Sequence, residues 1–264
     1  MDLGLKDNVI LVTGGAKGIG LGVAQVLAAE GAIPVIVGRN DADNAAAVQS
    51  IEAIGGRAWA VRAELNQTAD CQQAVAATVA KFQRIDGLVN NAGINDGINL
   101  EDGDTERFVA SLRKNLLHYY EMAHFALPEL KKSRGAIVNV GSKVAETGQG
   151  GTSAYAAANG GRNALTREWA VELAKYSIRV NAVIVAECWT PMYATWLATV
   201  PNPDETRRQI EGRIPFEHRM TTCEEIANTV AFLLSPRSSH TTGQLIHVDG
   251  GYVHLDRSLS SLGQ

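Results

Sequence analysis

The stretch Asn8–Gly20 reads NVILVTGGAKGIG and decides the fold. Its apolar run, Val9–Val12, is typical of a strand that is buried on both faces of a sheet. Gly14, Gly18 and Gly20 follow at G-x-x-x-G-x-G spacing, and an apolar pattern of helical period begins directly after them. A strand, a glycine turn and a helix in this order bring free main-chain N–H groups and the positive end of a helix dipole to one point. The sequence therefore predicts a binding site for a dinucleotide pyrophosphate there.

Length and composition limit the class of protein. The chain has 264 residues, 45% of them hydrophobic, and a formal net charge of −4. We expect residues 1–264 to form one α/β domain, because a chain of this length can bury a full core between layers. The charge favours neither nucleic acid nor an anionic membrane, and no apolar run is long enough to span a bilayer. The N-terminus lacks the layout of a signal peptide, so we expect a cytoplasmic protein with a small-molecule substrate.

The cysteines and histidines predict no metal site and no disulfide. Cys71, Cys188 and Cys223 are far apart and form no C-x-x-C pair, which is typical of reduced thiols. His118 and His124 fall in one helical segment, and no nearby residue completes a set of metal ligands.

Strand-like runs alternate with helical segments along the rest of the chain. Strands are expected at residues 9–12, 32–37, 58–61, 86–90, 135–140, 178–185 and 245–248, and helices after the glycine turn and at 41–54, 68–84 (with a Thr68 cap), 104–132, 155–175 and 224–234. Short joints between them specify a parallel sheet that is covered by helices on both faces, the doubly wound α/β fold class. Residues 186–220 read as a long irregular segment, typical of a substrate-binding loop.

The end of the second strand favours NADP(H) over NAD(H). A carboxylate at this position would bond the 2′-hydroxyl of the adenosine ribose and repel a 2′-phosphate. The sequence places Gly38 and Arg39 there instead, and Lys17 stands in the glycine turn on the same side. Asp41 or Asp43 could still reach the ribose, which keeps NAD(H) as the alternative.

At this point the sequence resembles the short-chain dehydrogenase/reductase family over nearly its full length. The matching residues are Thr13-Gly14-x-x-x-Gly18-Ile19-Gly20, Asn90-Asn91-Ala92-Gly93, Asn115, Ser142, Tyr155, Arg179-Val180-Asn181, Thr190, Gly243 and Asp249-Gly250-Gly251. The resemblance implies a single Rossmann-type domain with a sheet of seven parallel strands. It also implies a homo-oligomer, and we expect a homotetramer.

Three residues are predicted to carry the chemistry of hydride transfer. Exchange of a hydride between a nicotinamide and an alcohol carbon needs a group that moves the hydroxyl proton and donors that hold the oxygen. Tyr155 can act as the acid/base, and Ser142 can bond the substrate oxygen. The resemblance gives Asn115 the ordering of a water in the proton relay.

One position departs from the family pattern Tyr-x-x-x-Lys, because the fourth residue after Tyr155 is Asn159. In the family the lysine bonds the nicotinamide ribose and its charge favours the deprotonated tyrosine. Asn159 lies on the same helical face as Tyr155 and can bond the ribose, but it carries no charge. Arg162 and Lys143 are the nearby cations that could replace part of that charge.

The predicted cofactor contacts extend from the glycine turn to the loop after the sixth strand. They are Gly14, Lys17, Gly18, Ile19, Gly20, Arg39, Glu64, Leu65, Asn91, Ala92, Gly93, Tyr155, Asn159, Cys188 and Thr190. Val185-Ala186 stands where the family usually has Pro-Gly, before the segment that contacts the carboxamide.

Within the family, the sequence looks most like the sugar dehydrogenases of the L-fucose dehydrogenase type. The resembling stretches are Asn90–Gly97, Thr147–Gly150, Ala164–Val171, Ala186-Glu187, Thr190–Tyr193, His240–Gly243 and Val248–Arg257. The resemblance implies oxidation of a sugar hydroxyl to a lactone. The candidate substrate residues are Ser142 with Asn95, Gln149 and Glu187, which could bond hydroxyls, and Trp189 and Trp196, which could cover an apolar sugar face.

Asn159 keeps a second reading open. A homologue without the motif lysine could bind the cofactor yet have weak or lost catalysis, acting as a sensor or partner subunit. A third reading is a different reaction in the same site, such as dehydration or epimerisation.

Overall fold

Strands and helices alternate through the computed structural model, which describes residues 2–256; Met1 and residues 257–264, among them Arg257 of the C-terminal motif, lie outside the described part. The strands are β1 (Val9–Thr13), β2 (Ile33–Gly38), β3 (Trp59–Arg62), β4 (Gly87–Asn90), β5 (Ala136–Ser142), β6 (Arg179–Val185) and β7 (Leu245–Val248). The helices are α1 (Gly18–Ala29), α2 (Asp41–Glu52), α3 (Thr68–Phe82), α4 (Thr105–Leu112), α5 (His118–Ser133), α6 (Ser153–Leu173), α7 (Pro191–Leu197), α8 (Pro203–Glu211) and α9 (Cys223–Leu234). A π-helical turn, η1 (Arg113–Leu117), and the short 3₁₀ turns η2 (Lys143–Ala145), η3 (Ala174–Tyr176) and η4 (Pro236–Ser238) complete the elements.

The strands form one seven-stranded parallel sheet in the order β3-β2-β1-β4-β5-β6-β7. This confirms the predicted doubly wound fold. The chain order reverses between β1 and β4, so the connections leave these two strands in opposite directions. The carboxyl ends of strands at such a switch point border a crevice in which ligands bind.

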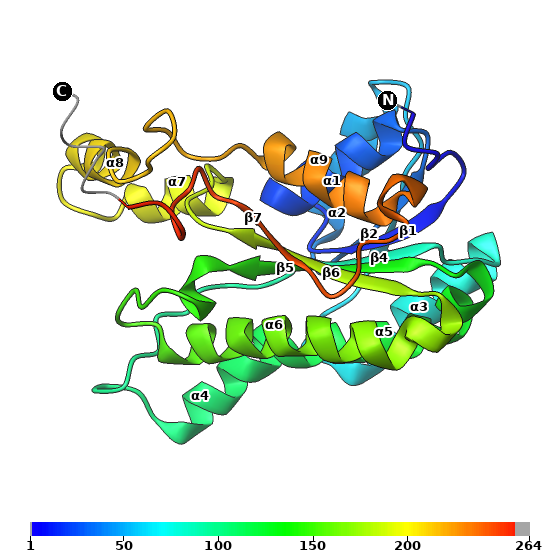
Figure 1. Cartoon of the computed structure of the whole chain (residues 1–264), viewed down its shortest axis with the longest axis horizontal. Coiled ribbons are helices and arrows are strands. Elements are labelled where there is room, and N and C mark those ends of the chain that lie inside the picture. Colours follow the sequence, from blue (N-terminus) through cyan, green and yellow to red (C-terminus); the bar gives the residue numbers. More distant parts are fainter. Residues whose placement is uncertain (1, 257–264) are drawn as a thin grey trace.

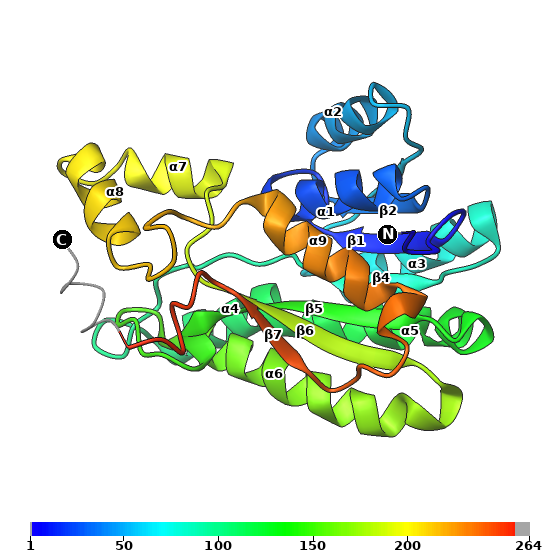
Figure 2. The same ribbon diagram turned by 45° about the horizontal axis from the view of Figure 1, so that its top comes forward.

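Two helical layers cover the sheet, as Figure 1 shows with α1 and α9 above it and α5 and α6 below it. Successive residues of β1 alternate between the two cores: Leu11 packs toward α3, α5 and α6, whereas Ile10 and Val12 pack toward α1 and α9. Figure 2 shows α9 lying beside α1 on one face. Strands buried on both faces read as continuous apolar runs, which is why the strand pattern was clear in the sequence.

The helix expected at residues 104–132 is three elements rather than one. It consists of α4, the π-helical turn η1 and α5, and α5 continues past Pro128 to Ser133. The polar residue Asn115 lies in the π-helical turn and is fully buried. A π-helical turn holds one more residue than a turn of α-helix. The apolar pattern of the sequence did not reveal this turn, because the segment is helical on both sides of it.

Two further expectations about local structure were wrong. The segment 186–220 is not irregular, because it contains α7 and α8, which project beyond the carboxyl ends of the strands (Figure 1). Thr190 caps α7 and Pro191 is its first residue, a start signal that the sequence carried. Thr68 is the first residue of α3 and not its cap, and its hydroxyl donates to Glu121 instead.

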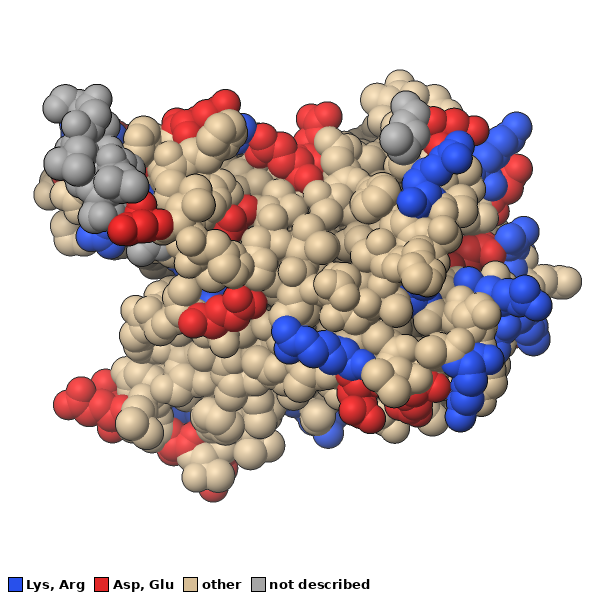
Figure 3. Space-filling model, in the orientation of Figure 1, with Lys and Arg blue, Asp and Glu red and all other residues tan. Residues whose placement is uncertain are grey.

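Figure 3 shows Lys and Arg side chains gathered at the end of the molecule away from α7 and α8. The same view shows a notch on the opposite side, between the lobe of α7 and α8 and the lobe that carries α4. Within residues 2–256, none of the helices combines the length and the apolar character that a membrane crossing requires.

Candidate active site

The turn after β1 has the backbone that a phosphate site requires. Gly14 and Gly18 have φ angles of +63° and +55°, which side chains with a Cβ rarely adopt. A Cβ at Gly20 would lie 2.2 Å from the carbonyl oxygen of Gly14, so glycine is required there. α1 begins at Gly18 with no side-chain cap and no acidic residue in its first turn. The N–H groups at its start are therefore free to bind an anion.

The loop after β4 packs directly against this turn. The Thr13 hydroxyl accepts from the main-chain N–H of Asn91 at 2.9 Å and of Ala92 at 3.1 Å. The Asn91 amide donates in return to the carbonyl oxygen of Thr13 at 2.9 Å. These bonds hold the predicted cofactor residues of β1 and β4 together at the switch point, and Ile19 follows Gly18 in the first turn of α1.

The loop after β6 reaches the same turn. The Thr190 side chain would contact a Cβ placed at Gly18, at 3.4 Å. Cys188 is buried, and its Sγ lies 3.9 Å from that of Cys223. This contact raises the pKa of Cys188 and lowers that of Cys223. The structure thus brings Thr190 beside the glycine turn, whereas the thiol of Cys188 faces another thiol.

The predicted adenosine end contains a further arginine, Arg62, which forms an ion pair with Asp41 at 3.7 Å. Lys17 forms an ion pair with Asp43 at 2.7 Å, and Arg39 forms one with Glu64 at 3.8 Å. A cavity of about 610 Å³ at the ends of β2 and β3 is lined by Arg39, Asn40, Arg62, Glu64, Asp70 and Gln73. Sequence reasoning missed Arg62, although the last residue of β3 lies beside Gly38 in the sheet register. Leu65 packs against the core below this cavity.

The three predicted catalytic residues come from different elements. Ser142 ends β5 and is half-buried, and its Oγ accepts weakly from the N–H of Val144 at 3.5 Å. Tyr155 lies in the first turn of α6 and is also half-buried. The side chain of Asn115 is bonded to the main chain, because its Oδ1 accepts from the N–H of Ile94 at 2.8 Å. The hydroxyl of Ser142 therefore lies at a strand end, and that of Tyr155 lies at the start of α6.

Asn159 is fully buried and its amide has internal partners. Its Nδ2 donates to the carbonyl oxygen of Tyr155 at 2.9 Å, and its Oδ1 accepts from Nη1 of Arg162 at 3.1 Å. Bonding of Asn159 to a ribose, as predicted from the sequence, would require its amide to leave these partners. The guanidinium carbon of Arg162 lies 6.0 Å from the centre of the Tyr155 ring.

Among the predicted substrate residues, Glu187 has the most contacts. It forms a buried ion pair with Lys143, and it accepts from the hydroxyl of Tyr193 at 2.9 Å. Burial and the charge of Glu187 raise the pKa of Tyr193. Tyr193 was not among the predicted site residues, and Lys143, expected as a cation that could replace part of the missing lysine charge, is instead paired with Glu187. The pair Thr190-Pro191 is typical of a helix start, and it was the available signal for Tyr193. The first turn of α7 brings the Tyr193 hydroxyl to Glu187.

The other predicted substrate residues are more exposed. Trp189 lies on the loop before α7 and Trp196 on α7, with 39% and 47% of their surfaces exposed, and the Arg207 guanidinium stacks on Trp189 at 4.3 Å. Asn95 accepts from the N–H of Gly97 at 3.3 Å, and Gln149 lies in the exposed loop before α6. The structure groups the two tryptophans around Tyr193 and leaves Asn95 and Gln149 on separate loops.

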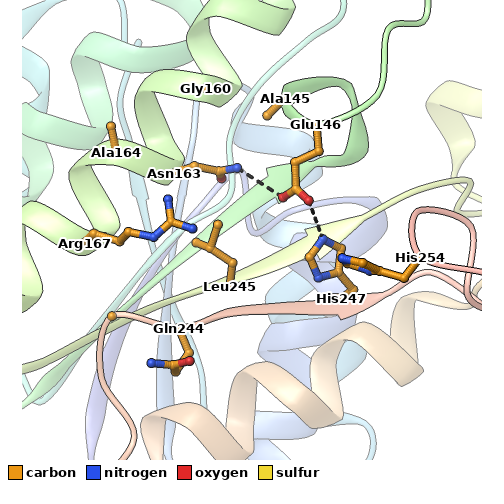
Figure 4. Close-up of a pocket in the computed structure, with 11 residues that line it drawn as sticks. Ala145, Glu146, Gly160, Asn163, Ala164, Arg167, Gln244, Leu245, His247 and His254 are labelled. Atoms are coloured by element: carbon orange, nitrogen blue, oxygen red, sulfur yellow. Dashed lines mark hydrogen bonds and ion pairs between the residues drawn. The ribbon is translucent and has the colours of Figure 1, made fainter.

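A second cavity, of about 760 Å³, lies between α6 and β7 (Figure 4). Glu146 forms its edge and accepts from ring Nε2 of His247 at 3.0 Å, while the His254 ring packs on that of His247. Potential ligand atoms of these three residues lie within 4.8 Å of one another, and this is the one such group among residues 2–256. The cluster was not predicted from the sequence, since Glu146 lies 101 positions before His247 in the chain.

The chain is similar to a known protein family and to several known proteins over nearly its whole length. Residues 14–253 match the family described as enoyl-(acyl carrier protein) reductase. The chain is 37% identical to 3-oxoacyl-[acyl-carrier-protein] reductase FabG of Thermotoga maritima, over 94% of this chain and 99% of that protein. It is 32% identical to L-fucose dehydrogenase of Bos taurus, over 92% of this chain and 88% of that one. The crystal structure of Cj0485 dehydrogenase superposes with a TM-score of 0.93 at 45% identity, covering 98% of each chain.

Proposed function

The chain belongs to the short-chain dehydrogenase/reductase family, and from this premise we propose that it is an NADP(H)-linked oxidoreductase acting on a hydroxyl of a sugar or polyol. The observation that supports the proposal is that the glycine turn, the Asn91–Gly93 loop and Ser142 follow the carboxyl ends of β1, β4 and β5, with Tyr155 in the first turn of α6. The residues of the turn fit a dinucleotide, since Cβ atoms would fill the space at Gly14 and Gly20. When bound, the nicotinamide exchanges a hydride with the alcohol carbon.

The chain's own residues hold the substrate and move the proton. We assign the acid/base role to the hydroxyl of Tyr155, and the hydrogen bond to the substrate oxygen to Ser142. We assign to Asn115, as the family resemblance implies, the ordering of a water in the proton relay; its main-chain oxygen also accepts from Nε of Arg162. Cys188 and Thr190 lie on the loop that would contact the nicotinamide amide, with the Thr190 side chain against Gly18.

The cofactor preference follows from the charges around the adenosine cavity. Arg39 and Arg62 both line it, and Lys17 stands in the glycine turn beside it. The acidic residues nearby already have partners, since Asp43 pairs with Lys17 and Glu64 with Arg39. A 2′-phosphate would meet guanidinium groups suited to bind it. We therefore assign NADP(H), with NAD(H) as the weaker cofactor.

A sugar is the substrate class that the loop 186–220 fits best. Aromatic rings pack on the apolar face of a sugar, and Trp189 and Trp196 present exposed rings on and before α7. Glu187 offers a carboxylate fixed by Lys143 and Tyr193. The relative from Bos taurus is an L-fucose dehydrogenase, which supports an aldose oxidised to a lactone.

Assembly and location complete the proposal. We assign residues 1–264 to one domain that acts as a cytoplasmic homotetramer. Large apolar side chains exposed on α4, η1, α5 and α6 support an assembly, because a second copy of the chain could cover them; they are Val109, Leu117, Tyr120 and Val171. Light scattering of the purified protein gives the number of subunits.

The test of the function is nicotinamide absorbance with NADP⁺ and NAD⁺ against a panel of aldoses that includes L-fucose. Ketones and a 3-oxoacyl thioester belong in the panel, because the relative from Thermotoga maritima is a 3-oxoacyl reductase. We expect turnover of an aldose with NADP⁺ that is lost in Tyr155→Phe. No turnover of any compound by a protein that binds NADPH would overturn the proposal. It would favour a cofactor-binding homologue without catalysis, a reading that the internally bonded Asn159 keeps open.

A further inference from the structure

Arg162 is a buried cation without an anionic partner. Only 3% of its surface is exposed. Its Nε donates to the carbonyl oxygen of Asn115 at 2.7 Å, and its Nη1 donates to the carbonyl oxygen of Val140 at 3.2 Å and to Oδ1 of Asn159 at 3.1 Å. All three acceptors are neutral, and no carboxylate within residues 2–256 forms an ion pair with this guanidinium. Buried charges are normally paired, so the protein holds this one at a cost in stability.

The ionisable side chains around Arg162 are neutral as well. The guanidinium lies over the ring of Tyr119 from α5, with its carbon 4.2 Å from the ring centre. Burial raises the pKa of Tyr119, and it lowers the pKa of His118 from the same helix to about 3, with the charge of Arg162 acting in the same direction on His118. Both groups are therefore uncharged at neutral pH. The positive charge of Arg162 remains uncompensated within this part of the core.

The free edge of the guanidinium faces the candidate active site. Nη2 has no hydrogen-bond partner, although the atom is buried. A Cβ placed at Gly93 would lie 2.8 Å from Nη2 and 3.1 Å from Oδ1 of Asn115. The centre of the Tyr155 ring lies 6.0 Å from the guanidinium carbon. The charge thus lies near both the Asn91–Gly93 loop and the tyrosine to which the proton transfer is assigned.

We propose that Arg162 is the positioning residue that stabilises the phenolate of Tyr155 during proton transfer. The inference rests on the function proposed above, in which Tyr155 moves the proton. The attraction between unit charges about 6 Å to about 12 Å apart changes an ionisation equilibrium by about 100-fold to about 10-fold at an effective dielectric constant of about 20. Arg162 acts through space, while its Nε and Nη1 bonds fix where the charge lies. Asn159 holds the guanidinium in place and supplies no charge itself.

The experiment measures the ionisation of Tyr155 directly, by the tyrosinate absorbance of each variant minus that of the same variant with Tyr155→Phe. We expect Arg162→Met to raise the midpoint of this ionisation by about one to two pH units and to lower kcat/KM at neutral pH by about 10-fold to about 100-fold, with NADPH affinity within about twofold. Arg162→Lys keeps a charge and recovers most of the shift. Arg167→Met removes an exposed charge from the same helix and leaves the midpoint unchanged.

A second variant keeps the test decisive if Arg162→Met does not fold. Asn159→Asp keeps the acceptor for Nη1 but pairs the guanidinium with a carboxylate, so it neutralises the charge without removing it. We expect it to raise the midpoint too, at a thermal stability no lower than that of the parent. An unchanged midpoint in Arg162→Met or in Asn159→Asp overturns the inference. Should the parent show no turnover while these midpoints move as expected, the proposed function fails and the electrostatic inference holds.

Discussion

The Nε atom of Arg162 donates a 2.7 Å hydrogen bond to the main-chain oxygen of Asn115, a residue 47 positions earlier in the chain. That oxygen lies in the π-helical turn between α4 and α5. An i→i+5 turn loosens the helical ladder and leaves carbonyl groups available to other donors. The side chain of Asn115 meanwhile bonds Ile94 and Ser111, which fixes the turn against the loop after β4.

The first prediction concerns the substitution Asn159→Lys, which creates the motif Tyr-x-x-x-Lys. A lysine here removes one of the two acceptors of Nη1 and places a second buried cation beside Arg162. We expect the variant to lose about 2–4 kcal/mol of unfolding free energy, since like charges at such separations repel strongly. We expect no gain in kcat. Urea unfolding and steady-state kinetics measure both quantities.

The control for this substitution is the double variant Asn159→Lys/Arg162→Leu. Removing one of the two cations should return stability, with a coupling energy of about 1–3 kcal/mol between the positions. An Asn159→Lys protein as stable as the parent and more active would contradict this account of the pair.

The second prediction concerns Tyr155→Phe. The substitution removes the hydroxyl to which we assign proton transfer while keeping the ring against its neighbours. We expect kcat to fall by about 10²-fold to about 10⁴-fold, the usual range for a general acid/base, with little change in NADPH affinity. Tyr176→Phe, at a surface tyrosine of η3, is the matched control and should leave kcat unchanged. Equal loss of cofactor binding in Tyr155→Phe would instead indicate a structural role for the ring.

Much of the fold and of the cofactor cradle could be predicted because the signals are local. The run before Thr13, the glycines after it and the start of α1 are adjacent in sequence, and the glycine spacing follows from backbone requirements at Gly14 and Gly20. The buried strands read as apolar runs because helices cover both faces of the sheet. The parallel direction of the strands then follows from the alternation of strands and helices.

The environment of the candidate site was less predictable because it depends on contacts between distant residues. Arg162 stood out in the sequence only as a nearby cation, and nothing local shows that Asn115 and Val140 hold it. The ion pair of Lys143 with Glu187 joins residues 44 positions apart. Arg62 was not predicted as a cofactor residue, because the third strand was expected to end at residue 61 and β3 ends at Arg62.

The third prediction concerns stability against pH. Burial holds the pKa of His118 at about 3, below its ordinary value of 6.5, so the folded protein keeps this ring neutral. The unfolded chain takes up the proton as the pH falls below about 6.5, and stability falls with it, by up to about 1.4 kcal/mol per pH unit. The contribution is fully present above pH 6.5 and is lost between there and the folded pKa.

The matched variant is His118→Gln, whose amide can still donate to the carbonyl oxygen of Lys114 that Nε2 now bonds at 2.9 Å. We expect its unfolding free energy to fall less steeply with acidification than that of the parent. Urea titrations of both proteins at a series of pH values give the two slopes, and parallel slopes would show that His118 titrates in the folded state as it does in the unfolded chain.

The last prediction concerns the cavity at the ends of β2 and β3, where we expect the adenosine of the cofactor to bind. Arg39→Ala and Arg62→Ala each remove one guanidinium from its lining, while Arg57→Ala removes a surface charge that pairs with Asp7 elsewhere. If the cavity receives a 2′-phosphate, each cavity variant should raise KM for NADP⁺ by about 10-fold to about 100-fold, because a charge-assisted hydrogen bond is lost. KM for NAD⁺ should stay within about twofold, since NAD⁺ lacks that phosphate. Added salt should weaken NADP⁺ binding more than NAD⁺ binding in the parent. This difference should be smaller in the double variant Arg39→Ala/Arg62→Ala. Equal effects on the KM of both cofactors would indicate that the arginines only shape the cavity. They would also favour NAD(H) as the cofactor.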